Sequence, residues 1–157
     1  MESVHNVLSF PKMRRLGKLL AQKICKSRSE LKNKAFVIAL EGELGAGKTQ
    51  FAKGLAQGLG IKQTISSPTF VVCKSYSAPK RGKKNCRCFD KFFHIDCYRL
   101  RSALEAQKIG LDKILANPRH IIVIEWPQII KKILPRDALW INFKTITKNT
   151  RRVTVVV

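Results

Sequence analysis

The chain has 157 residues, and 31 Lys and Arg residues against 10 Asp and Glu residues give a formal net charge of +21 at pH 7. This length suits one domain with a substantial core, and a hydrophobic content of 45% excludes wholesale disorder. No apolar run approaches the ~18 residues of a membrane-spanning helix, and charged residues interrupt the segment 13–24 where a signal-peptide core would lie. We therefore expect a single domain over 1–157 with no membrane association.

The positive charge would attract polyanions such as nucleic acid, acidic protein surfaces and anionic lipid. A solvated basic surface explains it equally well, and the sequence has no RNA-binding signature of the aromatic-sheet or glycine-loop kind. The charge therefore leaves open whether the protein contacts RNA directly.

The five cysteines form an odd count in a chain without a secretory signal, which is typical of reduced thiols in the cytoplasm. Cys86 and Cys88 are the only close pair, and a zinc site would need further ligands at suitable spacing. We therefore expect free thiols, no structural metal at this pair and a cytoplasmic location.

The elements expected along the chain alternate between helices and strands. Ser9 and Pro11 are typical of a helix start, because Ser caps free N–H groups and Pro is tolerated in the first turn. Continuous apolar runs at 35–40 and 121–124 predict strands that are buried on both faces. The expected elements are a helix over 11–27, a strand over 35–40, a helix from 48 to a stop at Gly60, a loop over 63–70, a strand over 70–76, a loop over 77–88, a strand over 89–98, a helix over 100–107, a strand over 119–124, a helical turn over 128–133, and strands over 138–143 and 151–157.

Residues 42–49 match the phosphate-loop pattern G-x-x-x-x-G-K-[ST] in full, between a buried strand and a helix. Gly45 and Gly47 allow the backbone to approach phosphate closely, and the helix N-terminus attracts its oxygens. Lys48 can bridge the β- and γ-phosphates, and the Thr49 hydroxyl can ligate Mg²⁺. The sequence has no N-K-x-D motif of the kind that reads guanine in GTPases, which favours ATP.

The order of elements predicts an α/β domain of three layers, like that of P-loop NTPases, with a mixed and mostly parallel central sheet. Residues 74–91 carry seven basic residues against Asp90 alone. This composition is typical of a solvated loop or hairpin insertion.

Two acidic residues follow or lie on expected strands. Glu125 ends an apolar run, where α/β sheets place ligand chemistry, and could hold Mg²⁺ directly or through water. Asp96 shares a strand face with His94 and Tyr98, because side chains alternate along a strand. Asp96 could orient the attacking water. His94 could fix the Asp96 carboxylate by a hydrogen bond. Tyr98 and Arg99 could anchor the strand end. The residues alone leave open which acid positions the water.

Two further features lie near this chemistry in the sequence. The loop Ser67, Pro68, Thr69 and Phe70 occupies the place of a switch that is ordered by γ-phosphate and Mg²⁺ in many phosphate-loop proteins. It could instead be a plain turn into the next strand. Trp126 follows Glu125 and packs either near the nucleotide or in the core.

Four segments resemble, in this order, the TsaE (YjeE) family of bacterial ATPases that act in tRNA threonylcarbamoyladenosine formation. They read GELGAGKT at 42–49, SPTF at 67–70, HIDCYRL at 94–100 and IEWP at 124–127. The phosphate loop is shared by many families, whereas the other three segments are more specific. The resemblance covers nearly the whole chain.

The resemblance implies a Mg²⁺-dependent ATPase, weak alone and stimulated by TsaB- and TsaD-like partners, that serves the formation of N6-threonylcarbamoyladenosine at position 37 of tRNA. It implies ATP and Mg²⁺ as cofactors and indirect contact with tRNA. The implied catalytic residues are Asp96, Glu125 and Lys48, and the metal ligands are Thr49 and Glu125. The implied nucleotide-binding residues are Gly42, Glu43, Leu44, Gly45, Ala46, Gly47, Lys48, Thr49, Gln50 and Trp126.

Two departures from the family pattern and two other functions bear on this interpretation. Gln128 stands where family members commonly have an acidic residue, and the segment 74–91 is longer and more basic than expected. A small-molecule kinase would share the fold, and residues 80–84 and Arg87 would then serve as its basic lid over the phosphates. A basic RNA-binding protein with a vestigial nucleotide site is the other alternative, and direct tRNA contact through a basic surface would be compatible with ATPase activity.

Overall fold

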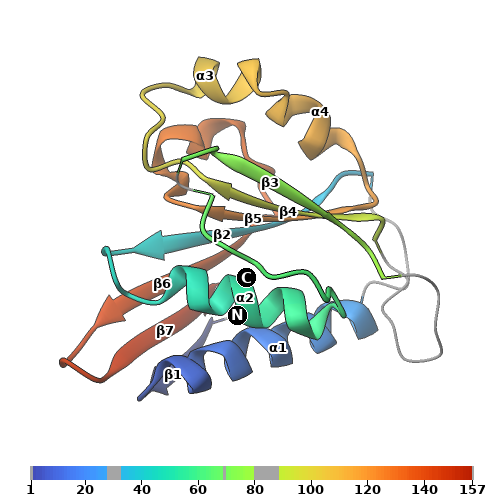
Figure 1. Ribbon diagram of the computed structural model, residues 1–157. Helices are drawn as coiled ribbons and strands as arrows, with labels where there is room; N and C mark the ends of the chain where they lie inside the picture. The colour runs from blue at the N-terminus through green and yellow to red at the C-terminus, as the bar shows by residue number, and fades with distance from the viewer. Residues whose placement is uncertain (1, 28–32, 69, 80–88, 157) are drawn as a thin grey trace.

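The computed structural model of the chain describes residues 2–27, 33–68, 70–79 and 89–156. Thr69, Cys86, Cys88 and the rest of 80–88 lie outside these ranges. Within the described residues, seven strands form one sheet in the order β1-β7-β6-β2-β5-β4-β3 (Figure 1). The strands are β1 (Glu2–Val7), β2 (Phe36–Gly42), β3 (Cys73–Ser77), β4 (Lys91–Asp96), β5 (His120–Glu125), β6 (Leu139–Thr145) and β7 (Arg151–Val156). The helices are α1 (Phe10–Ser27), α2 (Lys48–Gly58), α3 (Ala103–Lys108), α4 (Leu111–Ala116) and the 3-10 helix η1 (Pro127–Ile133).

The middle of the sheet is parallel and its margins are antiparallel. Strands β6, β2, β5 and β4 run in the same direction. Strands β7 and β3 run against their neighbours, and β1 runs against β7. The two apolar runs form β2 and β5, whose central residues are buried as expected for parallel strands with helices on both sides. The predicted α/β fold with a mixed, mostly parallel sheet is therefore confirmed.

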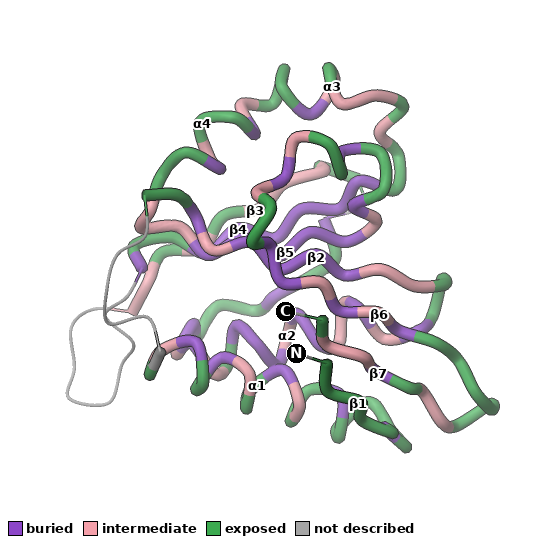
Figure 2. Tube along the Cα trace, turned by 180° about the vertical axis from the view of Figure 1, so that it is seen from behind, coloured by how far each residue is buried: buried purple, intermediate pink, exposed green. Residues whose placement is uncertain are grey.

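Helices cover both faces of this sheet and make three layers. Helices α1 and α2 lie side by side on one face, and α3, α4 and η1 lie on the other (Figure 1). Along β4, Phe92 packs into the core under α1 and α2, whereas Phe93 and Ile95 pack into the core with α3 and α4. The buried residues follow the central strands between the helical layers (Figure 2). None of the described helices is long and apolar enough to cross a membrane.

Helices α1 and α2 approach each other closely because glycines line their contact. A Cβ on Gly17 would collide with the backbone carbonyl of Phe51, and a Cβ on Gly54 would collide with the backbone of Arg14. The two helix backbones therefore meet directly, which fixes the position of α1 relative to the helix that follows the phosphate loop.

The strand expected over 70–76 begins at Cys73. The carbonyl oxygen of Pro68 accepts hydrogen bonds from the N–H groups of Val71 at 2.9 Å and Val72 at 2.6 Å, which makes a turn. Val72 also has a φ of 63°, a left-handed conformation that a strand cannot contain. The prediction was wrong over 70–72 because a turn follows the proline.

Two elements were not predicted. Strand β1 is exposed at every residue except Val7, so it has no hydrophobic alternation, and it forms by pairing with β7 from Glu2 opposite Val156 onward. Helix α4 follows α3 after a turn at Gly110, whose φ of 79° suits glycine.

The cysteines are not all in the expected state. Cys73 and Cys97 are free, but Cys25 is disulfide-bonded. The expectation of reduced thiols was therefore wrong for Cys25, because a cysteine count does not say which side chains the fold brings together. No group of three or more His, Cys, Asp and Glu side chains suited to a metal ion occurs in the described part of the chain.

Candidate active site

The candidate site lies where β2, β5 and β4 end and α2 begins. Glu125 pairs in register with Leu40 of β2 on one side and with Asp96 of β4 on the other. Their ends therefore place Asp96 and Glu125 at the same edge of the sheet, which is where open α/β sheets bind ligands. A cavity of about 310 Å³ opens there, between the phosphate loop and the two acids.

The phosphate loop carries the backbone from β2 into α2. Gly45 has a φ of 76°, and a Cβ built on it would meet no atom within 4 Å, so the backbone faces open space. Gly47 has a φ of 102° and is the N-cap of α2. Both conformations favour glycine, and the bare backbone at Gly45 leaves room for a phosphate group at the helix N-terminus.

Lys48 is buried at 4% exposure beneath the cavity. Its ammonium group donates hydrogen bonds to the carbonyl oxygens of Gly42 at 2.6 Å and Glu43 at 2.8 Å, and lies 3.9 Å from the ring centroid of Trp126. Burial lowers the pKa of the Lys48 ammonium, and the carboxylates of Glu125, Asp96 and Glu43 partly oppose this shift. A buried cation of this kind is suited to an anionic ligand.

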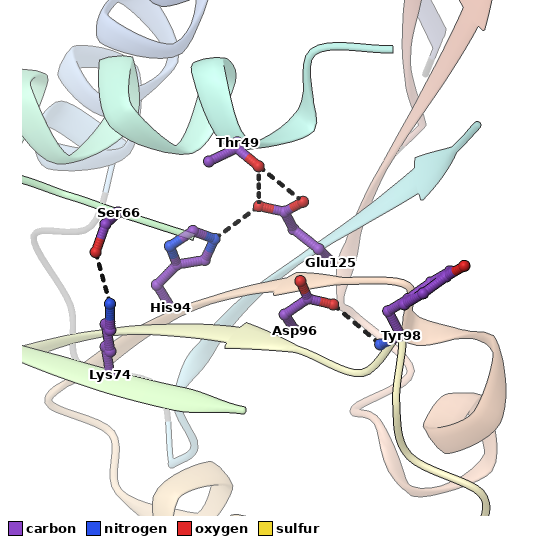
Figure 3. Close-up of polar contacts among 7 residues, drawn as sticks. All are labelled: Thr49, Ser66, Lys74, His94, Asp96, Tyr98 and Glu125. Carbon is purple, nitrogen blue, oxygen red and sulfur yellow. Dashed lines mark hydrogen bonds and ion pairs between the residues drawn. The ribbon is translucent and has the colours of Figure 1, made fainter. Parts of the chain in front are cut away.

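Glu125 accepts hydrogen bonds from two elements (Figure 3). The Thr49 hydroxyl donates to its Oε1 at 2.9 Å and its Oε2 at 3.1 Å, and His94 Nε2 donates to Oε1 at 2.8 Å. The hydroxyl and the carboxylate are hard oxygen ligands, which Mg²⁺ prefers. Thr49 and Glu125 therefore fit a magnesium ion that is also held by phosphate and water.

His94 supports a different acid from the one expected. The side chain is fully buried and its Nε2 contacts Glu125, while its Nδ1 finds no hydrogen-bond partner among the described residues. Asp96 is 3% exposed and its Oδ1 accepts the backbone N–H of Tyr98 at 2.9 Å (Figure 3). The expectation that His94 fixes Asp96 was wrong, because the parallel pairing of β4 with β5 places Glu125 within reach of the imidazole.

Two aromatic side chains form one wall of the cavity. Trp126 and Tyr98 line it, with ring centroids 5.1 Å apart and planes tilted by 55°. Trp126 has a φ of 58° at the start of η1, a conformation that is uncommon for a bulky residue. Trp126 thus lies at the cavity, where its ring could meet a nucleotide, rather than wholly in the core.

The predicted switch segment is only partly at the cavity. Ser67 lines it, whereas Pro68 is buried and Thr69 lies outside the described residues. Phe70 is 84% exposed and stacks under the guanidinium of Arg99 at 4.5 Å. Arg99 therefore contacts the segment through the ring of Phe70.

The structure brings most of the other predicted residues to the cavity. Leu44, Gly45, Gly47, Lys48, Thr49 and Gln50 line it from the phosphate loop, opposite Asp96 and Glu125. Gly42, Glu43 and Ala46 support the loop without lining the cavity. Phe10 was missed, and it lines the cavity from the start of α1. No local pattern marks it, apart from a large apolar side chain that is 46% exposed at a helix start.

Comparison with known proteins identifies the family. The sequence model described as "Threonylcarbamoyl adenosine biosynthesis protein TsaE" matches residues 9–153. Three similar proteins are each described as tRNA threonylcarbamoyladenosine biosynthesis protein TsaE. The Borreliella burgdorferi protein is 40% identical over 111 residues, covering 70% of this chain and 74% of its own. The Bacillus subtilis protein is 36% identical over 118 residues, covering 75% and 67%. The Rickettsia bellii protein is 33% identical over 144 residues, covering 85% and 92%.

The fold is also similar to that of a solved structure. The crystal structure of YdiB from Bacillus subtilis superposes with a TM-score of 0.72 and 26% sequence identity, over 99% of this chain and 84% of that one. The family model and the superposed structure each match nearly the whole of this chain. The chain therefore belongs to the TsaE family of tRNA threonylcarbamoyladenosine biosynthesis proteins.

Proposed function

We propose that this protein binds and hydrolyses ATP with Mg²⁺, as the ATPase of the machinery that forms N6-threonylcarbamoyladenosine at position 37 of tRNA. The observation that carries the proposal is the convergence of Lys48, Thr49, Asp96 and Glu125 on one cavity beside a phosphate loop. In a protein that no longer binds nucleotide, a buried lysine and two buried acids at one site would only destabilise the fold. Each buried charge costs free energy when it lacks its ligand.

Each side chain has a role that follows from its place. Lys48 would exchange the carbonyl oxygens of Gly42 and Glu43 for the β- and γ-phosphates, because a charged acceptor makes a stronger hydrogen bond than a neutral one. Thr49 and Glu125 would hold Mg²⁺, which neutralises phosphate charge when bound. Trp126 and Tyr98 would pack against the nucleotide from one side.

Asp96 is the better placed residue to position the attacking water. Both acids line the cavity: Glu125 binds Thr49 and His94, which suits it to Mg²⁺, and Asp96 lies on the neighbouring strand with its Oδ1 held by the N–H of Tyr98. The buried carboxylate can accept a hydrogen bond from water and orient it toward the γ-phosphate.

A partner surface is supported by the rim of the cavity. Three residues that line it have exposed side chains: Leu44 is 81% exposed, Tyr98 57% and Phe10 46%. Exposed apolar side chains gathered at a functional cavity are typical of an interaction site. We therefore include TsaB- and TsaD-like proteins as partners that cover this rim and stimulate hydrolysis. We place the activity in the cytoplasm, together with the tRNA that it serves.

The test measures phosphate release from ATP with and without Mg²⁺. We expect Lys48→Ala to lose nucleotide binding, and Glu125→Gln to lower the rate at least about a hundredfold. Asp96→Asn should keep ATP binding but lose hydrolysis. Asp112→Asn is the matched control, because it removes an exposed carboxylate on α4, which lies on the face of the sheet opposite to α1 and α2 and away from the cavity. Wild-type rates in both Lys48→Ala and Glu125→Gln would contradict the proposal.

A second set of measurements tests the pathway and the class of reaction. Hydrolysis should rise when the TsaB- and TsaD-like proteins from the same source are added, and an unchanged rate would remove those partners from the proposal. Transfer of phosphate to a small molecule instead of water would favour a kinase. The lid residues that such a kinase would use, 80–84 and Arg87, lie outside the described residues.

A further inference from the structure

The excess positive charge is distributed unevenly between the two helical layers. Helix α1 has no acidic residue, and its six basic side chains are all exposed: Lys12, Arg14, Arg15, Lys18, Lys23 and Lys26. Helix α2 has no acidic residue either. On the other face, α3 and α4 each carry one acid and one lysine. Helix η1 adds Lys131 and Lys132 to that face without an acid, so what distinguishes the face formed by α1 and α2 is six exposed basic side chains on one helix with no acidic residue in either helix.

A groove runs along this face between α1 and α2. Its cavity of about 540 Å³ is lined by Arg14, Arg15 and Lys18, together with Pro11, Leu19 and Gln22 of α1 and Gln57 of α2. No ion pair of these three basic residues is found among the described residues. The glycine contact between the two helix backbones holds the groove in place, so its cations do not depend on a loop for their arrangement.

The groove lies next to the candidate active site. Arg14 donates a hydrogen bond from Nε to Gln50 Oε1 at 2.7 Å, and Gln50 lines the nucleotide cavity. Phe10 lines that cavity, and its neighbour Pro11 lines the groove. The two sites therefore meet at the beginning of α1, and the hydrogen bond from Arg14 joins the groove to Gln50 in the first turn of α2.

We propose that the groove formed by Arg14, Arg15 and Lys18 binds the phosphate backbone of tRNA directly. The lining offers hydrogen-bond donors and positive charge, and arginine forks match phosphate oxygens. It contains no aromatic side chain, whereas the core of a protein interface is enriched in aromatic anchors. A membrane surface is disfavoured because the apolar residues Met13, Ala21 and Ile24 of α1 are buried in the core.

The choice of tRNA among RNAs rests on the proposed function, but binding in the groove does not require ATP hydrolysis. Contacts to backbone phosphates position an RNA without reading its sequence. The groove would thus hold tRNA against this protein while other proteins of the pathway recognise the modified base.

The experiment measures binding of fluorescent tRNA to the full chain over a series of salt concentrations. The test variant is Arg14→Gln/Arg15→Gln/Lys18→Gln, and the control is Lys108→Gln/Lys113→Gln/Lys132→Gln, which removes the same charge from α3, α4 and η1. We expect the groove variant to bind at least tenfold more weakly than wild type and the control variant less than threefold. The slope of log affinity against log salt should flatten by about two in the groove variant, since each lost phosphate contact removes ~0.7–0.9.

Three outcomes would overturn the proposal. The first two are no binding of tRNA by the wild-type chain at low salt and equal losses of tRNA affinity in the two triple variants. The third is displacement of tRNA by poly-glutamate at equal charge, which would indicate an acidic protein partner. If the groove variant does not fold, Lys18→Glu alone replaces it, because this side chain is exposed. Repeating the measurement with Asp96→Asn separates the two proposals, because tRNA binding should persist when hydrolysis is lost.

Discussion

Glu125 shows how one side chain connects distant parts of the sequence. Thr49 is 76 residues away from it and His94 is 31 residues away, yet both hydrogen-bond to its carboxylate. Because an ionised carboxylate only accepts, the hydrogen in the contact with His94 lies on Nε2. His94 therefore acts on Glu125 and not on the cavity itself, which makes it a positioning residue.

Replacing His94 should raise the Mg²⁺ concentration that hydrolysis requires. We expect His94→Ala to increase the Mg²⁺ concentration for half-maximal ATP hydrolysis about tenfold, because residues that orient metal ligands contribute this much to affinity. His94→Gln should restore most of the wild-type value, since its amide can donate where Nε2 does. The measurement is a Mg²⁺ titration of hydrolysis, and equal titration curves for the alanine and wild-type proteins would contradict this role.

Cys97 should be inert in the folded protein. Burial raises the pKa of its thiol to about 12, with Asp96 and Cys73 adding to the shift, and the residue is 3% exposed. At pH 8 the thiolate is then a fraction of only ~10⁻⁴, and the thiolate is the reactive form. Alkylation followed by peptide mapping should find Cys97 unlabelled until the protein is unfolded in guanidinium, and labelling at the rate of a free thiol would show that the site opens.

Helices α1 and α2 show how an element depends on residues that have no side chain. The glycines of α1 and α2 give their backbones a contact that any larger residue would prevent. Glycine weakens an isolated helix by about 1 kcal/mol relative to alanine. Its presence inside both helices therefore reflects packing between elements, not helix propensity.

Gly54→Ala should destabilise the protein although it improves helix propensity. The added Cβ would meet the backbone of Arg14, which cannot rotate away as a side chain can. We expect a loss of about 1–3 kcal/mol in the free energy of unfolding, measured by denaturant titration. Gln57→Ala, at an exposed position on the same helix, should change it by less than about 0.5 kcal/mol. A neutral Gly54→Ala would mean that the helices separate without loss.

At the scale of the whole molecule, the sheet joins the two halves of the site. Strands β2, β5 and β4 are neighbours, so the phosphate loop after β2, Glu125 at the end of β5 and Asp96 at the end of β4 meet at one edge. The helical layers on either side exclude water from the strands beneath them. A ligand at this edge would therefore stabilise the whole fold and not only the loop.

ATP with Mg²⁺ should raise the melting temperature. At a nucleotide concentration a hundredfold above the dissociation constant, binding adds about 2.7 kcal/mol to the free energy of unfolding. For a chain of this size that corresponds to roughly 5–10 °C, measured by thermal unfolding. Lys48→Ala should show no shift and Asp112→Asn the full shift, and an equal shift in Lys48→Ala would place the nucleotide elsewhere.

Local patterns determined much of this protein in advance. The apolar runs predicted β2 and β5, the phosphate-loop motif predicted the turn into α2, and the four ordered segments predicted the family. Each of these signals depends on residues close together in the sequence, where hydrophobic period and turn chemistry act directly. For the same reason, the sequence placed Glu125 at a strand end, whereas it carried the strand of Asp96 two residues too far, to Tyr98.

Only the tertiary structure decided which of these residues touch. It assigned His94 to Glu125, formed β1 by pairing it with β7, joined Cys25 in a disulfide and set a groove of arginines beside the nucleotide cavity. These contacts join segments far apart in the chain, and no local period encodes the order of strands in a sheet or the distance between two helices. They are determined when the strands pair and the glycines of α1 and α2 allow the layers to close.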